Sequence, residues 1–546
     1  MEGWIEAGSV KDFEDTDRKT ISGAVIFYDG EKFTACENRC PHMGYPMNKG
    51  TVRDGVVTCA WHNWQFDMQS GGCYRGACDD LQVYPVKVEG DKVFVQIQDP
   101  YDHFAMHAGR LVEGMLTSDP YLQAKAIALM LKSGGEAQDV VMVALEQAVR
   151  HSQTNHPNFQ AVYELQAIGD SYQLSENFSN RELVAVLLQG IRMAAGPSGD
   201  RLSVTSLPEN SILLDKVKAL LSRYAIDSSQ IGIERLLINS YEQNYGTDVE
   251  KHILEIVTEA EFLAVREAFV CCSAISYFGS KLDIERFKPA YYAWSVGNRR
   301  VEPDIETSLA INWLKKNRET IVNENFMNNS AAVDVNQVQA MVSGNSFEQS
   351  FDNLLKLLQE GAGIKPLLDA FSLICARRFS RIPINNGGLW NTATEGIRYI
   401  HALRRMFDKS PGAYCVKALF HMTFYFFKSR WVKFSGEWKG SYGEGESYFA
   451  DSFAENDVKA AVDAALTLVE MKEAGWEKEL LAPLLAEDNS TLQLNTISAV
   501  LSEIEFQSEW QPYISGLVTY ACDMKMGQNV TSAAKFGRSY LSSKES

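Results

Sequence analysis

The chain lacks the marks of a membrane, nucleic-acid-binding or disulfide-rich protein. Its longest apolar stretches, Ala268–Phe278 and Leu419–Phe427, are shorter than the roughly 20 residues that a bilayer crossing needs. It opens without the basic and apolar regions of a signal peptide. A net charge of −18 repels nucleic-acid phosphates and anionic lipid headgroups. With only ten cysteines in 546 residues, we expect a cytoplasmic protein without a disulfide scaffold and with no nucleic-acid or membrane partner.

Nucleotide-binding loops of the G-x-G-x-x-G or G-x₄-G-K-S/T type are also missing, so bound NAD, FAD or ATP is not indicated. Histidine is scarce, with nine in the chain, yet two histidines each pair with a cysteine. The pairs are Cys40 with His42 and Cys59 with His62. Two thiolates and two imidazoles can hold a [2Fe–2S] cluster in which sulfur binds one iron and nitrogen binds the other. A structural zinc site is the alternative, although zinc sites more often pair like ligands.

The first hundred residues carry the pattern of short β-strands joined by tight turns. Strand-like runs lie on both sides of three turns: Ala24–Tyr28 and Phe33–Cys36 around Asp29-Gly30, Thr51–Arg53 and Val56–Cys59 around Asp54-Gly55, and Val86–Val88 and Val93–Ile97 around Glu89-Gly90-Asp91. Asp-Gly between β-branched runs favours type I′ hairpins, because both central residues need positive φ. We therefore predict a small antiparallel β domain over residues 1–98, with both Cys/His pairs in loops.

The two loops, C-P-H-M-G-Y and C-A-W-H-N-W, resemble the cluster-binding loops of Rieske proteins. The resemblance covers the whole N-terminal segment and includes Gly44 in the first loop and Gly71-Gly72 beyond the second. It implies a Rieske-type [2Fe–2S] ferredoxin domain with one cluster per chain. The ligands implied by the resemblance are Cys40, His42, Cys59 and His62.

The resemblance also bears on the reduction potential. Rieske proteins of respiratory cytochrome bc complexes carry a disulfide between the two loops, where this chain has Tyr45 and Trp61. They also direct a Ser and a Tyr hydroxyl at the cluster sulfurs, where this chain has Trp64 and Phe66. Because such hydrogen bonds stabilise the reduced cluster, we expect a potential near the low end of the range, about −150 mV rather than about +300 mV. Asn63 is a departure, since the family commonly has Gly after the second histidine.

After Asp99-Pro100 the hydrophobic period changes from two to 3.6. Helical faces are formed by Leu122, Ala126, Leu129 and Met130, by residues 139–151, by Phe351, Leu354, Leu355 and Leu358, and by Val458, Ala461, Val462, Ala465 and Val469. Loops are expected at 196–211, 323–345, 383–388 and 434–446. The predicted fold class is multi-domain, a small all-β domain followed by a large all-α region. The predicted domains are 1–98, a junction at 99–110, and helical regions at 111–330 and 331–546, which could be one domain.

A second metal site in the helical region stays open. His103 and His107 would share a helix face, or simply lie at a domain junction. Asp248, His252 and Glu255 share a helix face as in di-iron bundles, or form a solvated surface. The D-x₂-H-x₄-H-like spacing of the mononuclear iron in terminal Rieske oxygenases is missing, so we do not expect a conventional oxygenase α-subunit.

Two further features have two interpretations each. Cys73 and Cys78 are a redox pair or two unligated loop thiols. His401 and His421 lie in strongly apolar helices, as buried histidines satisfied by neighbours or as bases in a substrate pocket. Apolar helices that bear histidines, such as the one around His401, also give the region a likeness to questin oxidase-type helical proteins, which carries over no residues.

Two functional hypotheses follow. In the first, the cluster accepts an electron from an external reductase or ferredoxin and passes it to an oxidase- or oxygenase-like site in the helical region, which acts on a small organic substrate. In the second, the chain is a non-enzymatic electron carrier whose helical half is a docking scaffold for a separate oxidase.

Overall fold

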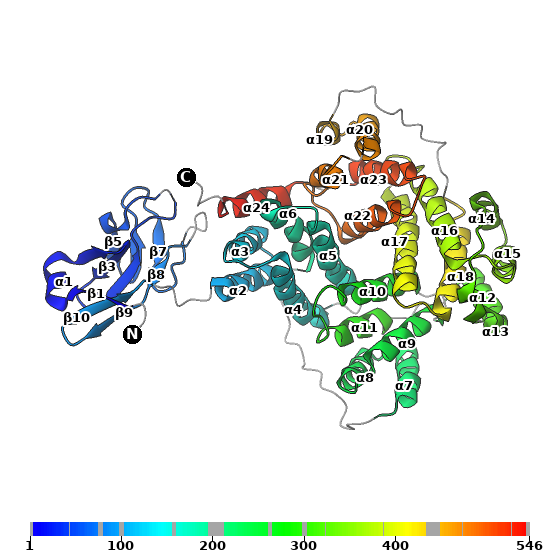
Figure 1. Ribbon diagram of the computed structural model, residues 1–546, viewed down its shortest axis with the longest axis horizontal. Helices are drawn as coiled ribbons and strands as arrows, with labels where there is room; N and C mark the ends of the chain where they lie inside the picture. Colours follow the sequence, from blue (N-terminus) through cyan, green and yellow to red (C-terminus); the bar gives the residue numbers. More distant parts are fainter. Residues whose placement is uncertain are drawn as a thin grey trace. The chain divides into compact units, whose positions relative to one another are not determined.

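The computed structural model describes residues 4–42, 44–74, 80–97, 103–155, 160–194, 212–259, 265–297, 303–322, 324–385, 387–432, 448–471, 473–525 and 527–541. The chain divides into two compact units. The N-terminal unit comprises residues 1–106 and 539–546, and the helical unit comprises residues 107–538. Figure 1 shows the strands of the first unit and the helices of the second.

The N-terminal unit is built from short antiparallel strands in three sheets, β1-β10-β9, β2-β3-β4-β8 and β5-β6-β7. The strands are β1 (Trp4–Ser9), β2 (Arg18–Ile21), β3 (Ala24–Tyr28), β4 (Phe33–Glu37), β5 (Thr51–Arg53), β6 (Val56–Thr58), β7 (Gln65–Asp67), β8 (Val83–Tyr84), β9 (Val86–Glu89) and β10 (Lys92–Gln96). A short 3₁₀ helix, η1, spans Met47–Lys49. The three predicted hairpins are therefore present as the pairs β3–β4, β5–β6 and β9–β10.

The three turns differ in geometry. Asp54 and Gly55 both have positive φ, 51° and 75°, as the type I′ prediction requires. Between β3 and β4 only Gly30 has positive φ, and the Asp29 carboxylate instead accepts hydrogen bonds from the backbone N–H groups of Glu31 and Lys32. Between β9 and β10 only Gly90 has positive φ.

A helix in the N-terminal unit, α1 (Val10–Thr16), is absent from the sequence prediction. Its N-terminus is a capping box, in which Ser9 accepts from the Asp12 backbone and Asp12 accepts from the Ser9 backbone. Phe13 anchors the helix, fully buried and edge-on to Phe33 at 5.2 Å between ring centroids.

Beyond residue 103 every described element is a helix apart from one isolated bridge between Ala331 and Ala362, which confirms the predicted fold class. The helices are α2 (His103–Leu116), α3 (Pro120–Lys132), α4 (Ala137–Asn155), α5 (Gln160–Ser175), α6 (Asn180–Ile191), η2 (Arg192–Ala194), α7 (Leu214–Ile226), α8 (Gln230–Glu242), α9 (Gly246–Glu259), α10 (Val265–Phe278), α11 (Lys288–Val296), α12 (Ile305–Lys316), α13 (Arg318–Ile321), η3 (Glu324–Asn328), α14 (Val335–Val342), α15 (Phe347–Gln359), α16 (Ile364–Phe379), α17 (Gly387–Lys409), α18 (Ala413–Lys428), α19 (Phe449–Ala454), α20 (Val458–Met471), α21 (Trp476–Leu484), α22 (Thr491–Ile504), α23 (Gln511–Asp523) and α24 (Asn529–Ser539).

The four helical faces predicted from the sequence lie in α3, α4, α15 and α20. The predicted loop at 323–345 is wrong, because η3 and α14 lie within it. Asp334 caps α14 by accepting from the Asn336 backbone, and Val338 and Met341 bury its apolar face. The predicted loops at 196–211 and 434–446 lie outside the described residues.

The longest helix of the described part, α17, has a central place in the helical unit because it packs against α10, α16, α18 and α22. Helix α22 in turn packs against α5. In the described part of the chain, none of the helices is long and apolar enough to span a membrane.

Candidate metal centre

The first cysteine loop follows β4 and is closed by two backbone hydrogen bonds. The Cys40 N–H donates to the Tyr45 carbonyl at 2.7 Å, and the Gly44 N–H donates to the Cys40 carbonyl at 2.7 Å. Gly44 has a φ of 75°, in the left-handed region where glycine carries no steric penalty. The turn therefore holds Cys40 and His42 within one closed loop.

The second cysteine loop follows β6 and repeats this turn. The Cys59 N–H donates to the Trp64 carbonyl at 2.8 Å, and the Asn63 N–H donates to the Cys59 carbonyl at 3.0 Å. Asn63 has a φ of 57°, at the position that corresponds to Gly44. Asparagine is among the few residues that adopt this conformation readily. Asn63 can therefore take the place of the glycine that the family commonly has here, and the turn still forms.

Both cysteines are deeply buried, with exposed fractions of 2% for Cys40 and 1% for Cys59. They belong to one hydrophobic core together with Met47, Phe66 and Leu81, and neither is in a disulfide. The thiol groups are thus shielded from water, in surroundings that would exclude solvent from a bound cluster.

The two histidines meet at the surface of this core. Their ring centroids are 4.9 Å apart and their planes are at 86°. The His62 side chain is exposed, whereas His42 is half-buried and its ring lies 4.9 Å from that of Trp64. Trp61 lies against His62 at 4.3 Å between centroids, and it is itself 50% exposed.

An aromatic contact joins the two loops. The rings of Tyr45 and Trp61 lie 5.6 Å apart at 40°, at the positions where the cytochrome bc proteins carry their disulfide. Phe66, at the position of the tyrosine hydroxyl donor, is fully buried in the core with Cys40 and Cys59. Neither Trp64 nor Phe66 offers a hydroxyl group to a cluster sulfur.

The donor set fits a two-iron cluster. His42 Nδ1 is buried and has no hydrogen-bond partner among the described residues, as expected of an atom that binds iron instead. Burial and the neighbouring His62 lower the pKa of His42, which favours the neutral imidazole that binds metals. Two thiols in the core and two imidazoles at its edge match the unsymmetrical ligation of one iron by sulfur and the other by nitrogen.

A model of the Rieske [2Fe-2S] domain family matches residues 3–85. The biphenyl dioxygenase ferredoxin subunit of Pseudomonas sp. (strain KKS102) is 33% identical over 87 residues, which are 16% of this chain and 75% of that protein. The chain therefore belongs to the Rieske family, and its N-terminal unit is an electron-transfer domain that carries a [2Fe–2S] cluster.

Two further relatives show how partial the match is. The ferredoxin component of the alkene monooxygenase system of Xanthobacter autotrophicus is 37% identical over 65 residues, 12% of this chain and 53% of that protein. Human apoptosis-inducing factor 3 is 34% identical over 93 residues, 16% of this chain and 15% of that protein. The chain thus spans only a small part of the latter, and the family match ends at residue 85, before the helical unit begins.

The other candidate ligands are dispersed. Among the described residues, no group of three His, Cys, Asp or Glu side chains could hold a single metal ion. His252 is engaged by Ser222, by the Lys218 carbonyl and by Glu255, whose pKa this hydrogen bond lowers. His107 lies 3.2 Å from Arg110, measured between Nδ1 and Nη1.

The remaining sequence candidates lie in different surroundings. Cys73 forms a β-bridge with Phe66 and packs against the core that holds Cys40 and Cys59, whereas Cys78 lies outside the described residues. His421 lies in α18 and is 2.7 Å from the Thr258 carbonyl through Nε2, as a buried histidine satisfied by a neighbour.

Proposed function

We propose that Cys40, His42, Cys59 and His62 hold the cluster, and that it passes single electrons to an oxidase or oxygenase site in the helical unit. The matched turns of the two cysteine loops support the first part, because each turn carries one cysteine and one histidine, both cysteines belong to one core, and the two imidazole rings lie 4.9 Å apart. The helical unit is large enough to enclose a substrate site, and we propose a small organic molecule as its substrate. An external reductase or ferredoxin would supply the electrons.

A second candidate is a non-enzymatic carrier whose helical unit docks a separate oxidase. Two of the relatives support the carrier function, because one is the ferredoxin subunit of a dioxygenase and the other is the ferredoxin component of a monooxygenase system. Turnover of substrates by the purified chain with an artificial reductant would exclude this second function. A reducible cluster with no turnover, and a stable oxidase partner, would support it.

Replacement of one proposed ligand tests the cluster assignment. We expect His62→Ala to abolish the Rieske electron paramagnetic resonance signal of the anaerobically reduced full-length protein, because one iron loses half of its protein ligands. Cys73→Ser is the matched control, since Cys73 packs against the same core without belonging to a Cys/His pair, and its signal should persist. The wild-type potential should lie near −150 mV, about the low end of the Rieske range. A persistent signal in His62→Ala, or a single zinc ion in the wild type, would contradict the assignment.

A further inference from the structure

The two cysteine loops are each closed by their own backbone hydrogen bonds, and these bonds do not fix the distance between the loops. The Cys40 N–H donates to Tyr45 within the first loop, and the Cys59 N–H donates to Trp64 within the second. The bases of both loops are held by the core that contains Cys40 and Cys59. At the loop tips, the separation therefore depends on contacts between side chains. A cluster with ligands from both loops needs this separation to be constant.

Three ring contacts join the tips of the two loops in the part of the chain that the structure describes. The ring centroids of His42 and His62 are 4.9 Å apart, and those of His42 and Trp64 are also 4.9 Å apart. The third contact is that of Tyr45 with Trp61, at 5.6 Å and 40°. The first two contacts use His42, a proposed ligand of the cluster. The contact of Tyr45 with Trp61 uses none of the four proposed ligands.

Trp61 also links this contact to one of the proposed ligands. Its ring lies 4.3 Å from that of His62, with the two planes at 33°. At the other end, Tyr45 packs against the core that contains Cys40 and Cys59. Ring pairs at these distances are favourable beyond the area that they bury. The core is thus connected to the exposed imidazole through Tyr45 and Trp61 in succession.

We propose that Tyr45 and Trp61 form a ring tie that positions the two cluster loops, and that Trp61 shields His62 from water. Both are positioning residues, because they act on the cluster through the loops and through His62. By holding the second loop in place, the ring tie slows the loss of iron. By shielding the imidazole, Trp61 disfavours the more negative, reduced cluster and keeps the reduction potential low. This assignment rests on the proposed function, because it takes the four ligands from it.

The first test needs no cluster, so it does not depend on the proposed ligands. Amide hydrogen exchange of the full-length protein, prepared without iron, reports on the Asn63 N–H, which donates to the Cys59 carbonyl in the second loop. Tyr45→Ala changes only the first loop, yet it should speed this exchange by at least about twofold, because an aromatic pair favours the joined state by roughly two- to tenfold. Tyr45→Phe keeps the ring and should leave the exchange unchanged. Unchanged exchange in Tyr45→Ala would overturn the proposal.

The second test measures iron release from the holoprotein to a chelator, followed by the visible circular dichroism of the cluster. Trp61→Ala should release iron at least about threefold faster than the wild type and should have a higher reduction potential. Trp61→Phe should restore both quantities towards the wild type. Tyr28→Ala is the matched control, because it removes a stacked ring pair with Phe33, at 4.5 Å and 21°, in the other core of the N-terminal unit. Its iron release and potential should stay as in the wild type.

The double variant Tyr45→Ala/Trp61→Ala distinguishes a tie from two independent losses of packing. If the two rings act on each other, the double variant should release iron about as fast as the faster single variant. Effects that multiply, equal iron release in Tyr28→Ala and Trp61→Ala, or an unchanged potential in Trp61→Ala would overturn the proposal. A wild type without a cluster would instead contradict the proposed function, and the exchange measurement would still decide on the ring tie.

Discussion

Asn63 shows how one side chain decides whether a cluster-binding turn can form. Its φ of 57° is a conformation that costs most L-residues roughly 1–2 kcal/mol. We therefore expect Asn63→Gly to keep or raise the thermal stability of the N-terminal unit, and Asn63→Ala to lower its free energy of unfolding by about 1 kcal/mol. The visible circular dichroism of the cluster reports the transition. Equal midpoints for the two variants would show that the turn is not what limits stability here.

Asp170 gives a prediction on pH dependence. Burial raises its pKa from 3.8 to about 6, against the opposing charge of Arg405. Between pH 3.8 and about pH 6, the folded protein therefore keeps a proton on Asp170 that the unfolded chain has already released. The contribution of Asp170 to stability falls as the pH rises from 4 to 6. The shift corresponds to about 3 kcal/mol. Relative to the wild type, Asp170→Asn should therefore be more stable at pH 7 than at pH 4 by about this amount, as chemical denaturation at both pH values can measure.

The same pH comparison has a built-in control. Asn495→Ala removes the hydrogen bond to Asp170 but keeps the carboxyl group, so its stability relative to the wild type should lack the gain at pH 7. A difference between Asp170→Asn and the wild type that is independent of pH would contradict the raised pKa.

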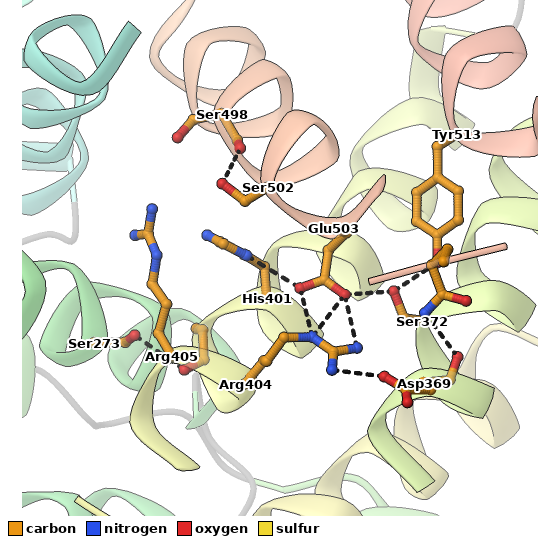
Figure 2. Close-up of polar contacts among 12 residues, drawn as sticks. Ser273, Asp369, Ser372, His401, Arg404, Arg405, Ser498, Ser502, Glu503 and Tyr513 are labelled. Atoms are coloured by element: carbon orange, nitrogen blue, oxygen red, sulfur yellow. Dashed lines mark hydrogen bonds and ion pairs between the residues drawn. The ribbon is translucent and has the colours of Figure 1, made fainter. Parts of the chain in front are cut away.

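Individual site residues were predictable only where the chemistry is local. The Cys/His spacing identified the four candidate ligands, because each pair lies within one loop. The partner of His401 was not predictable, since Glu503 lies 102 residues away and comes into contact only through the packing of α17 on α22 (Figure 2). The hydrogen bond from Arg405 to Gln173, 232 residues away, has the same origin. A helical pattern places these side chains on a face but does not reveal what that face meets.

Secondary structure was predictable where the pattern was long or the turn was specific. The type I′ prediction is right at Asp54-Gly55, whose two residues fill the whole turn. At Asp29 the turn is four residues long, and the Asp29 carboxylate takes the place of a second positive φ. Helix α1 and helix α14 were missed because both are short, although Ser9 and Asp334 are capping signals that could have identified them.

Helix α15 illustrates what the long patterns contribute. Phe351 is fully buried, with its ring 5.0 Å from that of Trp313 and 5.4 Å from that of Phe420. We expect Phe351→Ala to lower the free energy of unfolding of the helical unit by about 3–5 kcal/mol, because the cavity adds to the lost burial. Denaturation followed at 222 nm measures this loss. Asn353→Ala, on the exposed face of the same helix, should change stability by less than about 0.5 kcal/mol.

The chain divides into two compact units, which leads us to expect separate unfolding transitions. Phe13 is buried in a core of the N-terminal unit, although not in the core that includes the cluster cysteines. Phe13→Ala should destabilise the N-terminal unit as a whole. It should therefore lower the temperature at which the visible circular dichroism is lost, while the main 222 nm transition stays unchanged. Phe351→Ala should do the reverse. Coincident shifts of both signals in either variant would show that the units unfold as one.

The matched turns around Cys40 and Cys59 have a consequence for biogenesis. Both are closed by main-chain hydrogen bonds and by the Tyr45–Trp61 contact, none of which uses a side chain of the four proposed ligands. We therefore expect the turns to form independently of iron and sulfide, so that little chain entropy is lost on insertion. Such a domain would accept a ready-made cluster from a donor scaffold without first having to fold around it.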